Sequence, residues 1–312
     1  MTTLHEPSPG RAARERLSLT AEGTSAATFG TTDWGLVLGA SAIWGASFLF
    51  IAEGLETLAP GLVTVLRIAF GWLVLTTVRR ARTTRVDRDD WPRLVVVSIV
   101  WFAIPMTIFP IAEQWISSSI TGMLNGALPI FSTGLAALLL HRLPGRYQLA
   151  GIAVGFAGIV LISLPSWQGG ARTALGAVLV LVAMMSYAFA GNLMVPLQHR
   201  YGALAVIWRA QLVGMVLTAP YGIVGVTEST LAWRPVGAVF LLGTLGTGVA
   251  FVLAGTLFGR VGASRGSIIA YLIPVVALAL GVVLRDEHVE AIAVAGLSLA
   301  IVGAWLTSRA GR

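Results

Sequence analysis

A segment that occurs twice constrains this chain more than any other feature of its sequence. Residues 264–308 form two apolar runs joined by a short polar link, and residues 118–163 have the same pattern. A constant offset of 145 residues aligns the two stretches and matches Pro129 with Pro274. Internal repetition of this kind indicates that each copy is one structural unit. The chain is therefore expected to consist of two related halves.

The similarity continues upstream with a slightly different offset. At 142 residues, the segment around Arg67 pairs with the segment around Arg209, and the tripeptide Val-Leu-Thr follows each of them. These matches predict a first repeat at residues 34–164 and a second repeat at residues 174–308. Residues 1–33 are polar and lack an apolar core, so we expect a disordered cytoplasmic tail rather than a cleavable signal peptide.

The composition places both repeats in a lipid bilayer. Hydrophobic residues make up 56% of the 312 residues and charged residues only 11%, whereas soluble domains carry about 25% charged residues. A helix needs about 20 predominantly apolar residues to cross the hydrocarbon core. We therefore predict an all-α integral membrane protein with ten transmembrane helices, five in each repeat. The expected spans are residues 34–54, 59–78, 94–113, 118–140, 147–164, 174–195, 204–224, 235–258, 265–284 and 290–307.

The arginines predict how these spans are oriented. The chain has no lysine, and its net charge of +7 comes from arginine. With the N-terminus inside, 16 of the 21 arginines lie in cytoplasmic segments, and only Arg172, Arg234 and Arg285 lie in outer links. This distribution follows the positive-inside rule. Both termini are therefore expected to be cytoplasmic, and the basic charge is attributed to the membrane topology rather than to binding of nucleic acid.

The odd number of spans in each repeat has a topological consequence. The second repeat must enter the membrane from the side opposite to the first, which makes the two halves inverted-topology repeats. Many secondary transporters use such repeats to build a central site that opens alternately to either side. The predicted architecture therefore favours transport over other membrane functions.

Several short motifs resemble those of one transporter family. The sequence reads IWGASF at residues 43–48, RIAF at residues 67–70 and GAS at residues 262–264, followed by Pro274 and Glu287. Together they resemble the drug/metabolite transporter superfamily, and within it the EamA-type ten-helix exporters, over nearly the whole chain. The resemblance implies outward transport of an amino acid or a related compound by alternating access.

The resemblance also implies a glutamate nine residues before a glycine of the last span in each repeat. Glu287 has this spacing from Gly296, whereas Arg142 has it from Gly151. The role of this glutamate is therefore carried over to the second repeat alone.

Arg67 and Arg209 are the charged residues expected well inside spans. A charge within the bilayer is costly and is by default a functional hypothesis. One interpretation is that one or both attract the carboxylate of a substrate, which a guanidinium fork fits well. The alternative is that each extends toward the nearer interface or satisfies carbonyls at a broken helix. The sequence leaves both interpretations open.

An aromatic set is predicted to line the substrate cavity. Aromatic walls hold flat or amphipathic metabolites, and tyrosine adds a polar hydroxyl. The alternative for each ring is helix packing or contact with lipid. The set consists of Trp44, Trp101, Phe102, Tyr187 and Tyr271.

Polar residues and prolines complete the predicted substrate site. Ser47 belongs to the motif of the first span, and Asn125 shares one helix face with Pro129. Residues four apart on a helix lie on the same side. A proline inside a helix frees a carbonyl and bends the helix, so Pro129 and Pro274 are expected to kink their spans.

Glycines in the fifth and tenth spans are expected to let helices approach closely. Gly151 and Gly155 have the small-xxx-small spacing that is typical of packed membrane helices. The same glycine faces also suggest a homodimer that forms through these two spans.

The sequence lacks the residues that metal binding, ATP hydrolysis or enzymatic catalysis would need. Cysteine is absent and the four histidines are scattered, so we expect no metal site. The sequence has no G-x-x-x-x-G-K-[ST], G-x-S-x-G or H-E-x-x-H motif, so we expect no cofactor, no ATP-driven motor and no enzyme. The acids Glu53 and Glu113 lie at predicted outer ends of spans, which ranks proton-driven export of cationic drugs low.

We therefore predict a secondary transporter that exports a small metabolite, with an amino acid or related carboxylate-bearing compound as the first choice. Its partners are the small-molecule substrate and the lipid bilayer. The alternatives are a non-transporting membrane scaffold or subunit, and a proton-coupled exporter of cationic drugs. Arginine in place of lysine, with abundant alanine and glycine, indicates a high-GC bacterial source and hence the plasma membrane.

Overall fold

The computed structural model describes residues 30–140, 145–261 and 268–309, and all regular secondary structure in these ranges is helical. The predicted tail lies outside the described residues up to position 29. The elements are α2 (Thr31–Gly54), α3 (Pro60–Thr76), α4 (Arg79–Thr83), η1 (Arg88–Asp90), α5 (Trp91–Ser98), η2 (Ile99–Ala103), α6 (Ile104–Ala112), α7 (Ser118–Leu124), η3 (Asn125–Ala127), α8 (Leu128–Leu140), α9 (Arg146–Gln168), α10 (Ala171–Tyr201), α11 (Ala203–Thr227), α12 (Trp233–Leu241), η4 (Leu242–Val249), α13 (Ala250–Val261), α15 (Ile269–Arg285) and α16 (Ala291–Arg309).

Six helical segments of the described residues are long and apolar enough to cross a membrane. They are Thr31–Gly54, Arg88–Ala112, Leu149–Gln168, Ala171–Gly191, Ala203–Thr227 and Trp233–Leu257. Three further apolar helices, Pro60–Thr76, Ile269–Arg285 and Ala291–Leu306, are shorter. The chain is thus an all-helical, multi-pass membrane protein, while the number of ten spans and their inverted arrangement remain predictions.

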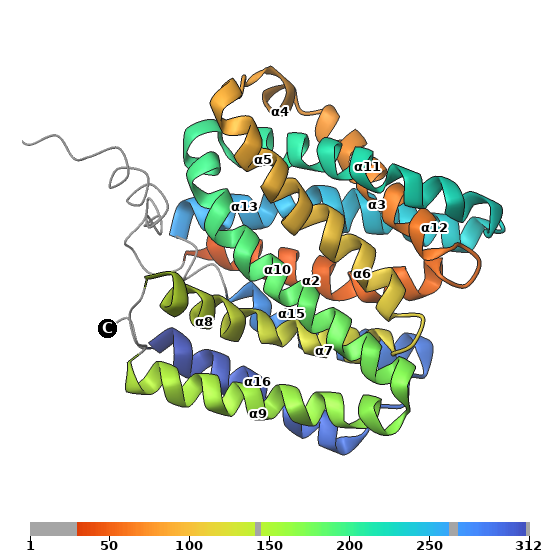
Figure 1. Cartoon of the computed structure of the whole chain (residues 1–312), viewed down its shortest axis with the longest axis vertical. Coiled ribbons are helices and arrows are strands. Elements are labelled where there is room, and N and C mark those ends of the chain that lie inside the picture. Colours follow the sequence, from red (N-terminus) through yellow and green to blue (C-terminus); the bar gives the residue numbers. More distant parts are fainter. Residues whose placement is uncertain (1–29, 141–144, 262–267, 310–312) are drawn as a thin grey trace, which may run out of the picture.

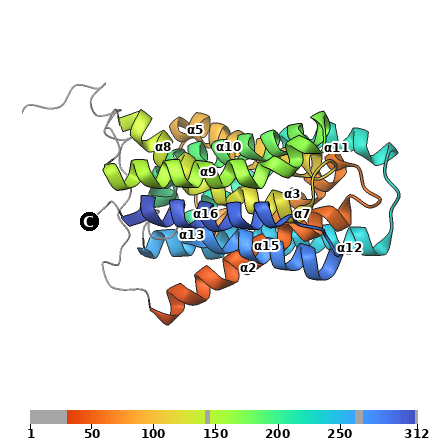
Figure 2. The same ribbon diagram turned by 90° about the horizontal axis from the view of Figure 1, so that it is seen from below.

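The helices run roughly parallel or antiparallel and form a layered bundle. In Figure 1, α9 and α16 form one edge and α11 lies at the opposite edge, with α2, α15 and α10 between them. The view turned by 90° agrees, because α16 again lies directly beside α9 (Figure 2). In the same bundle, α11 packs against α3, and α15 packs against α2. Segments from both predicted repeats therefore alternate across the interior.

The two ends of the bundle carry different charged groups. At one end, where α2 begins and α13 ends, Arg260 pairs with Asp33 at 2.6 Å, and Arg200 pairs with Asp87 at 2.6 Å. We refer to it as the arginine-rich end. The other end, where α2, α6 and α15 finish, is referred to as the glutamate-bearing end, and Glu53 there pairs with Arg285. Ion pairs of this partly exposed kind contribute about 0.2–1 kcal/mol each.

Two of the long helical segments change their backbone hydrogen-bond pattern midway. Both η2, between α5 and α6, and η4, between α12 and α13, are π-helical. Such π-bulges are frequent at functional sites. In a third helical segment, the 3₁₀ turn η3 separates α7 from α8. Pro129 is the second residue of α8, directly after this turn, and Pro274 lies inside α15.

The closest helix contact of the bundle depends on glycine. A methyl group added to Gly158 of α9 would meet backbone atoms of Ala300, and one added to Gly303 of α16 would meet backbone atoms of Gly155. Small residues let membrane helices approach in this way. The glycine faces of α9 and α16 are therefore used within one chain. The predicted homodimer through these helices remains a prediction that these glycines do not support.

Replacing Gly158 by alanine is expected to lower the melting temperature of the purified protein. Overpacking against backbone costs about 1–3 kcal/mol, which exceeds the roughly 1 kcal/mol that alanine gains over glycine in a helix. The matched control is Gly191→Ala in α10, where the added methyl group would meet nothing within 4 Å. Equal melting temperatures for the two variants would contradict the close packing of α9 on α16.

Candidate functional site

A buried guanidinium lies at the centre of the candidate site. Arg67 is in the middle of α3, and the residue is only 4% exposed. Its Nε donates a hydrogen bond of 3.4 Å to Oγ1 of Thr247 in η4. Its Nη1 is buried and has no hydrogen-bond partner among the described residues. Since buried charged donors are normally satisfied, this nitrogen marks a place where a polar ligand would be stabilised.

The close approach of η4 to α3 holds this guanidinium in place. A methyl group added to Gly243 would meet the backbone of Arg67, so the two helices pack at this level with almost no space between them. From α11, which packs against α3, Nε2 of Gln211 donates to the carbonyl of Thr247 at 2.6 Å. Gln211 is fully buried, and its Oε1 lacks a partner in the described part of the chain.

A carboxylate faces the same region from α6. Glu113 directly follows α6 as its C-cap, and both of its carboxylate oxygens are buried without a hydrogen-bond partner among the described residues. Arg67 interacts electrostatically with this carboxylate and with Tyr187 of α10. The site therefore contains a cation and an anion that do not bond to each other.

Aromatic rings lie near both charges, because Tyr187 interacts with Arg67 and Phe109 is one turn from Glu113. The rings of Phe48 and Phe109 are 5.5 Å apart, and the rings of Phe109 and Tyr187 are 6.1 Å apart. Phe109 lies one turn before Glu113, hence on the same face of α6. The three rings thus form an apolar wall beside a cation and an anion, an arrangement that is typical of sites for small amphipathic molecules.

The remaining members of the predicted aromatic set are placed in two other locations. Trp44, Trp101 and Phe102 surround Phe251, with ring centroids 5.2, 5.0 and 5.0 Å from it. Phe102 is fully buried there. Tyr271 instead donates to the carbonyl of Ala304 in α16 at 2.7 Å.

The aromatic cluster around Phe251 still reaches the Arg67 site through one residue. Nε1 of Trp44 donates to the carbonyl of Gly246 at 3.0 Å, directly next to Thr247. Ser47, one turn further along α2, packs against the same glycine, and its hydroxyl donates to the carbonyl of Ile43 at 2.9 Å.

The predicted polar residue of the fourth span lies apart from Arg67. Asn125 is buried in η3, a turn that packs against α15 and α16. A methyl group added to the neighbouring Gly126 would contact the ring of Pro274. The structure therefore groups Asn125 and the two prolines around η3 rather than with Arg67.

Arg209, the repeat counterpart of Arg67, has its hydrogen bonds satisfied by the backbone. Its guanidinium donates to the carbonyls of Ala81 and Ala205 at 3.1 Å, and also to the carbonyl of Thr84. These carbonyls belong to the connection after α3 and to the first turn of α11. The placement matches the alternative in which the arginine satisfies backbone carbonyls, and the structure does not bring Arg209 to Arg67.

Glu287, to which the family resemblance assigned a role, caps a helix. Its Oε1 accepts from the backbone N–H and the hydroxyl of Ser118 at 3.0 and 2.6 Å, and its Oε2 accepts from the N–H of Ser119 at 2.8 Å. The left-handed conformation of Asp286 (φ 51°) turns the chain toward α7. Carboxylates at a helix N-terminus are stabilised by the helix dipole, so Glu287 fixes α7 to the end of α15.

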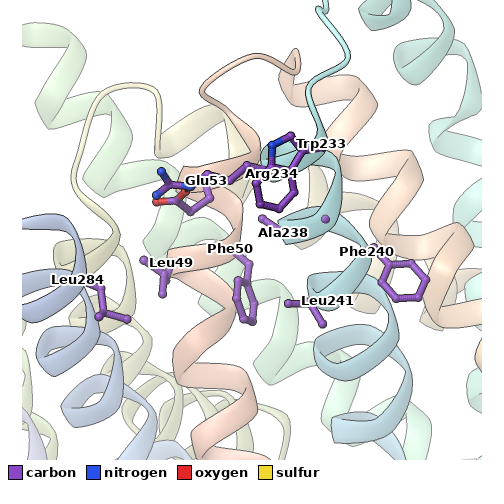
Figure 3. Close-up of a pocket in the computed structure, with 10 residues that line it drawn as sticks. Leu49, Phe50, Glu53, Trp233, Arg234, Ala238, Phe240, Leu241 and Leu284 are labelled. Atoms are coloured by element: carbon purple, nitrogen blue, oxygen red, sulfur yellow. The ribbon is translucent and has the colours of Figure 1, made fainter.

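A separate groove opens between α2 and α12 at the glutamate-bearing end. Its volume is about 590 Å³. Figure 3 shows Arg234 and Glu53 at the upper rim, above Phe50 and Leu241, and the two charged groups pair at 2.9 Å. The lining is otherwise apolar and consists of Leu49, Phe50, Trp233, Gly237, Ala238, Phe240, Leu241 and Leu284. Arg67 does not line this groove.

Two residues of the candidate site were not among the residues predicted from the sequence, although the sequence contained a signal for each. Gln211 is an amide within an apolar span, two residues after the arginine that drew attention. Glu113 was placed at the outer end of its span, where a carboxylate can be solvated. The structure buries its oxygens instead. Among the described residues, no group of three His, Cys, Asp or Glu side chains could hold a metal ion.

Comparisons with known proteins agree on one class. The sequence profile of the EamA-like transporter family matches residues 34–164 and 174–309. The chain is 27% identical to a "Probable terminal-alkyne amino-acid exporter" of Streptantibioticus cattleyicolor, over 88% of this chain and 93% of that protein. It is 25% identical to a "Probable amino-acid metabolite efflux pump" of Salmonella typhimurium, over 85% and 90%. A solved crystal structure with 19% identity has the same fold, with a TM-score of 0.62 over 88% of this chain and 96% of its own.

Replacing Arg209 by alanine is expected to loosen the connection after α3. The variant loses the donors that hold the carbonyls of Ala81 and Thr84, and hydrogen bonds to charged groups contribute about 1.5–3 kcal/mol. Limited trypsin digestion followed by mass spectrometry should show cleavage between residues 79 and 88 that is faster by about tenfold. Arg209→Lys keeps the charge but has fewer donors, so its cleavage rate should fall between the rates of the wild type and of Arg209→Ala. Unchanged cleavage in the alanine variant would contradict the structural role.

Proposed function

Since the chain belongs to the EamA-like transporter family, we propose that it is a secondary transporter that exports a small metabolite, namely an amino acid or a related carboxylate-bearing compound. The two relatives named as an amino-acid exporter and an amino-acid metabolite efflux pump support this class of substrate. The family consists of transporters rather than enzymes, which agrees with the absence of catalytic motifs from the sequence.

We also propose the topology that this function requires. Ten spans form two inverted repeats, and the arginine-rich end faces the cytoplasm of a bacterial cell, with both termini there. The similar placement of η2 in the first repeat and η4 in the second supports the repeat, because their first residues are 143 apart, close to the offset of 145 that aligns the sequences.

The observation that carries the substrate class is the free Nη1 of buried Arg67. A guanidinium in an apolar bundle is stabilised by an anion that accepts two parallel hydrogen bonds, as a carboxylate does. The ring of Tyr187 and its neighbours on α2 and α6 then contact the apolar part of the molecule. Arg67 is accordingly the residue that orients the substrate.

We propose that transport proceeds by alternating access, and the ion pairs at the two ends of the bundle support this mechanism. Arg285–Glu53 ties α15 to α2 at the glutamate-bearing end, and Arg260–Asp33 ties α13 to α2 at the arginine-rich end. Exposed pairs of this strength can open and close at low cost. A substrate that binds one state more tightly shifts the balance between the two states, and α2 is the element common to both ends.

A proton-coupled exporter of cationic drugs is the second candidate, because Glu113 supplies the buried carboxylate that such a mechanism needs. In that case the transported compounds would be amines that lack a carboxylate. Arg67 would then carry no substrate contact, so its replacement would not change the profile of exported compounds.

Expression of the intact chain in bacterial cells is expected to raise the concentration of one or more amino acids or related carboxylates in the medium. Mass spectrometry of the medium compares the wild type, Arg67→Ala and an empty vector at equal membrane levels. The accumulation should disappear in Arg67→Ala, because the carboxylate loses its partner. Arg79→Ala, an exposed arginine on α4, is the matched control and should export like the wild type. No accumulation with any chain would favour a non-transporting scaffold and contradict the proposal.

A further inference from the structure

Glu113 and Arg67 lie at different levels along the axis of the bundle, on two helices that are in contact. The hydroxyl of Thr64 donates to the carbonyl of Met106 at 3.1 Å, which fixes the relative level of α3 and α6. Arg67 lies three residues after Thr64 in α3, and Glu113 lies seven residues after Met106. Because the two helices run in opposite directions, Arg67 and Glu113 lie on opposite sides of this contact along the bundle axis. At 1.5 Å per residue, their Cα atoms are about 15 Å apart along the axis.

The direction of the side chains closes most of this separation. In a helix, the Cα–Cβ bond tilts toward the N-terminus. The N-terminus of α3 is at the glutamate-bearing end and that of α6 is at the arginine-rich side, so the side chains of Arg67 and Glu113 extend toward one another. They interact electrostatically, yet the Glu113 oxygens receive no hydrogen bond in the described part of the chain.

Among the described residues, no cation is in hydrogen-bond contact with the carboxylate of Glu113. Arg285 interacts with it electrostatically but is paired with Glu53, and the nearby Glu287 is bonded to the first turn of α7. Glu287 repels Glu113 rather than stabilising it. An ionised Glu113 is therefore stabilised most by a cation that arrives from the Arg67 side, where the rings of Phe109 and Tyr187 form the wall.

We propose that Glu113 binds the ammonium group of the substrate while Arg67 binds its carboxylate, so that the site selects zwitterionic α-amino acids over simple carboxylates and simple amines. The inference rests on the proposed function and narrows its substrate class. An α-amino acid carries its ammonium and carboxylate groups on the same carbon atom, so it can contact both side chains at once. Its side chain then lies along the wall of Phe48, Phe109 and Tyr187, which favours an apolar or aromatic amino acid.

Three matched compounds test this selectivity on the purified full-length protein. They are phenylalanine, 3-phenylpropionate, which lacks the ammonium group, and phenethylamine, which lacks the carboxylate. Affinity is obtained from the rise in melting temperature as each compound is titrated, because a ligand that binds the folded state stabilises it. We expect the wild type to bind phenylalanine at least about tenfold more tightly than either analogue.

Glu113→Gln separates the two charged contacts. It should weaken binding of phenylalanine by about tenfold and leave binding of 3-phenylpropionate unchanged, which also shows that the variant is folded. Glu113→Asp keeps the charge and should retain part of the preference. The matched control is Glu228→Gln, because Glu228 is an exposed carboxylate at the same end of the bundle.

Three outcomes would overturn the proposal. Wild-type protein that binds 3-phenylpropionate as tightly as phenylalanine has no ammonium site. If Glu113→Gln binds phenylalanine as tightly as the wild type, and a pH gradient no longer stimulates phenylalanine transport by this variant in proteoliposomes, Glu113 is a proton carrier. Tighter binding of phenethylamine than of phenylalanine assigns the site to cations. Because these measurements report binding, they are independent of whether cells export a carboxylate, which tests the proposed function itself.

Discussion

Every backbone carbonyl that leaves the α-helical pattern inside an apolar bundle must find another donor, since lipid offers none. This constraint determines where the polar side chains of the protein lie. The π-helical stretch η4 presents two consecutive carbonyls, and Trp44 and Gln211 donate to them from α2 and α11. Three elements from distant parts of the sequence are thereby held at one point, and Arg67 is anchored to the same point by Thr247.

The two buried arginines show how similar positions in related repeats acquire different environments. Arg209 gives its donors to carbonyls at the end of α3 and the start of α11, and its guanidinium lies 5.4 Å from the ring of Trp208. Arg67 has one hydroxyl within hydrogen-bond distance and one nitrogen without a partner among the described residues. A fully satisfied arginine fixes a connection, whereas a partly satisfied one retains hydrogen-bonding capacity for a ligand.

The sequence alone predicted the features that follow from composition and repetition. The apolar segments indicated a helical membrane protein, and the motifs around Trp44 and Arg67 indicated the family, which the profile match confirms. The site was harder to predict, because spacing shows which residues share a helix face but not what that face contacts. Tyr271 was expected to line the substrate cavity; its hydroxyl bonds to α16, which its spacing did not indicate, and its substrate contact stays a prediction. The burial of Glu113 depends on how α6 is rotated by packing against α3 and α10, which no local pattern encodes.

The length of α10 sets the position of the whole bundle relative to the bilayer. With 31 residues it measures about 46 Å, whereas the hydrocarbon core is only about 30 Å thick. A helix of this length is longer than the hydrocarbon core is thick, and its last turn, which carries His199 and Arg200, forms an extension toward the lipid headgroups. Arg200, paired with Asp87 and Asp90, lies on this extension. Through these ion pairs, α10 holds the charged connection after α3 at its own C-terminal end, where phosphates and water can solvate the charges.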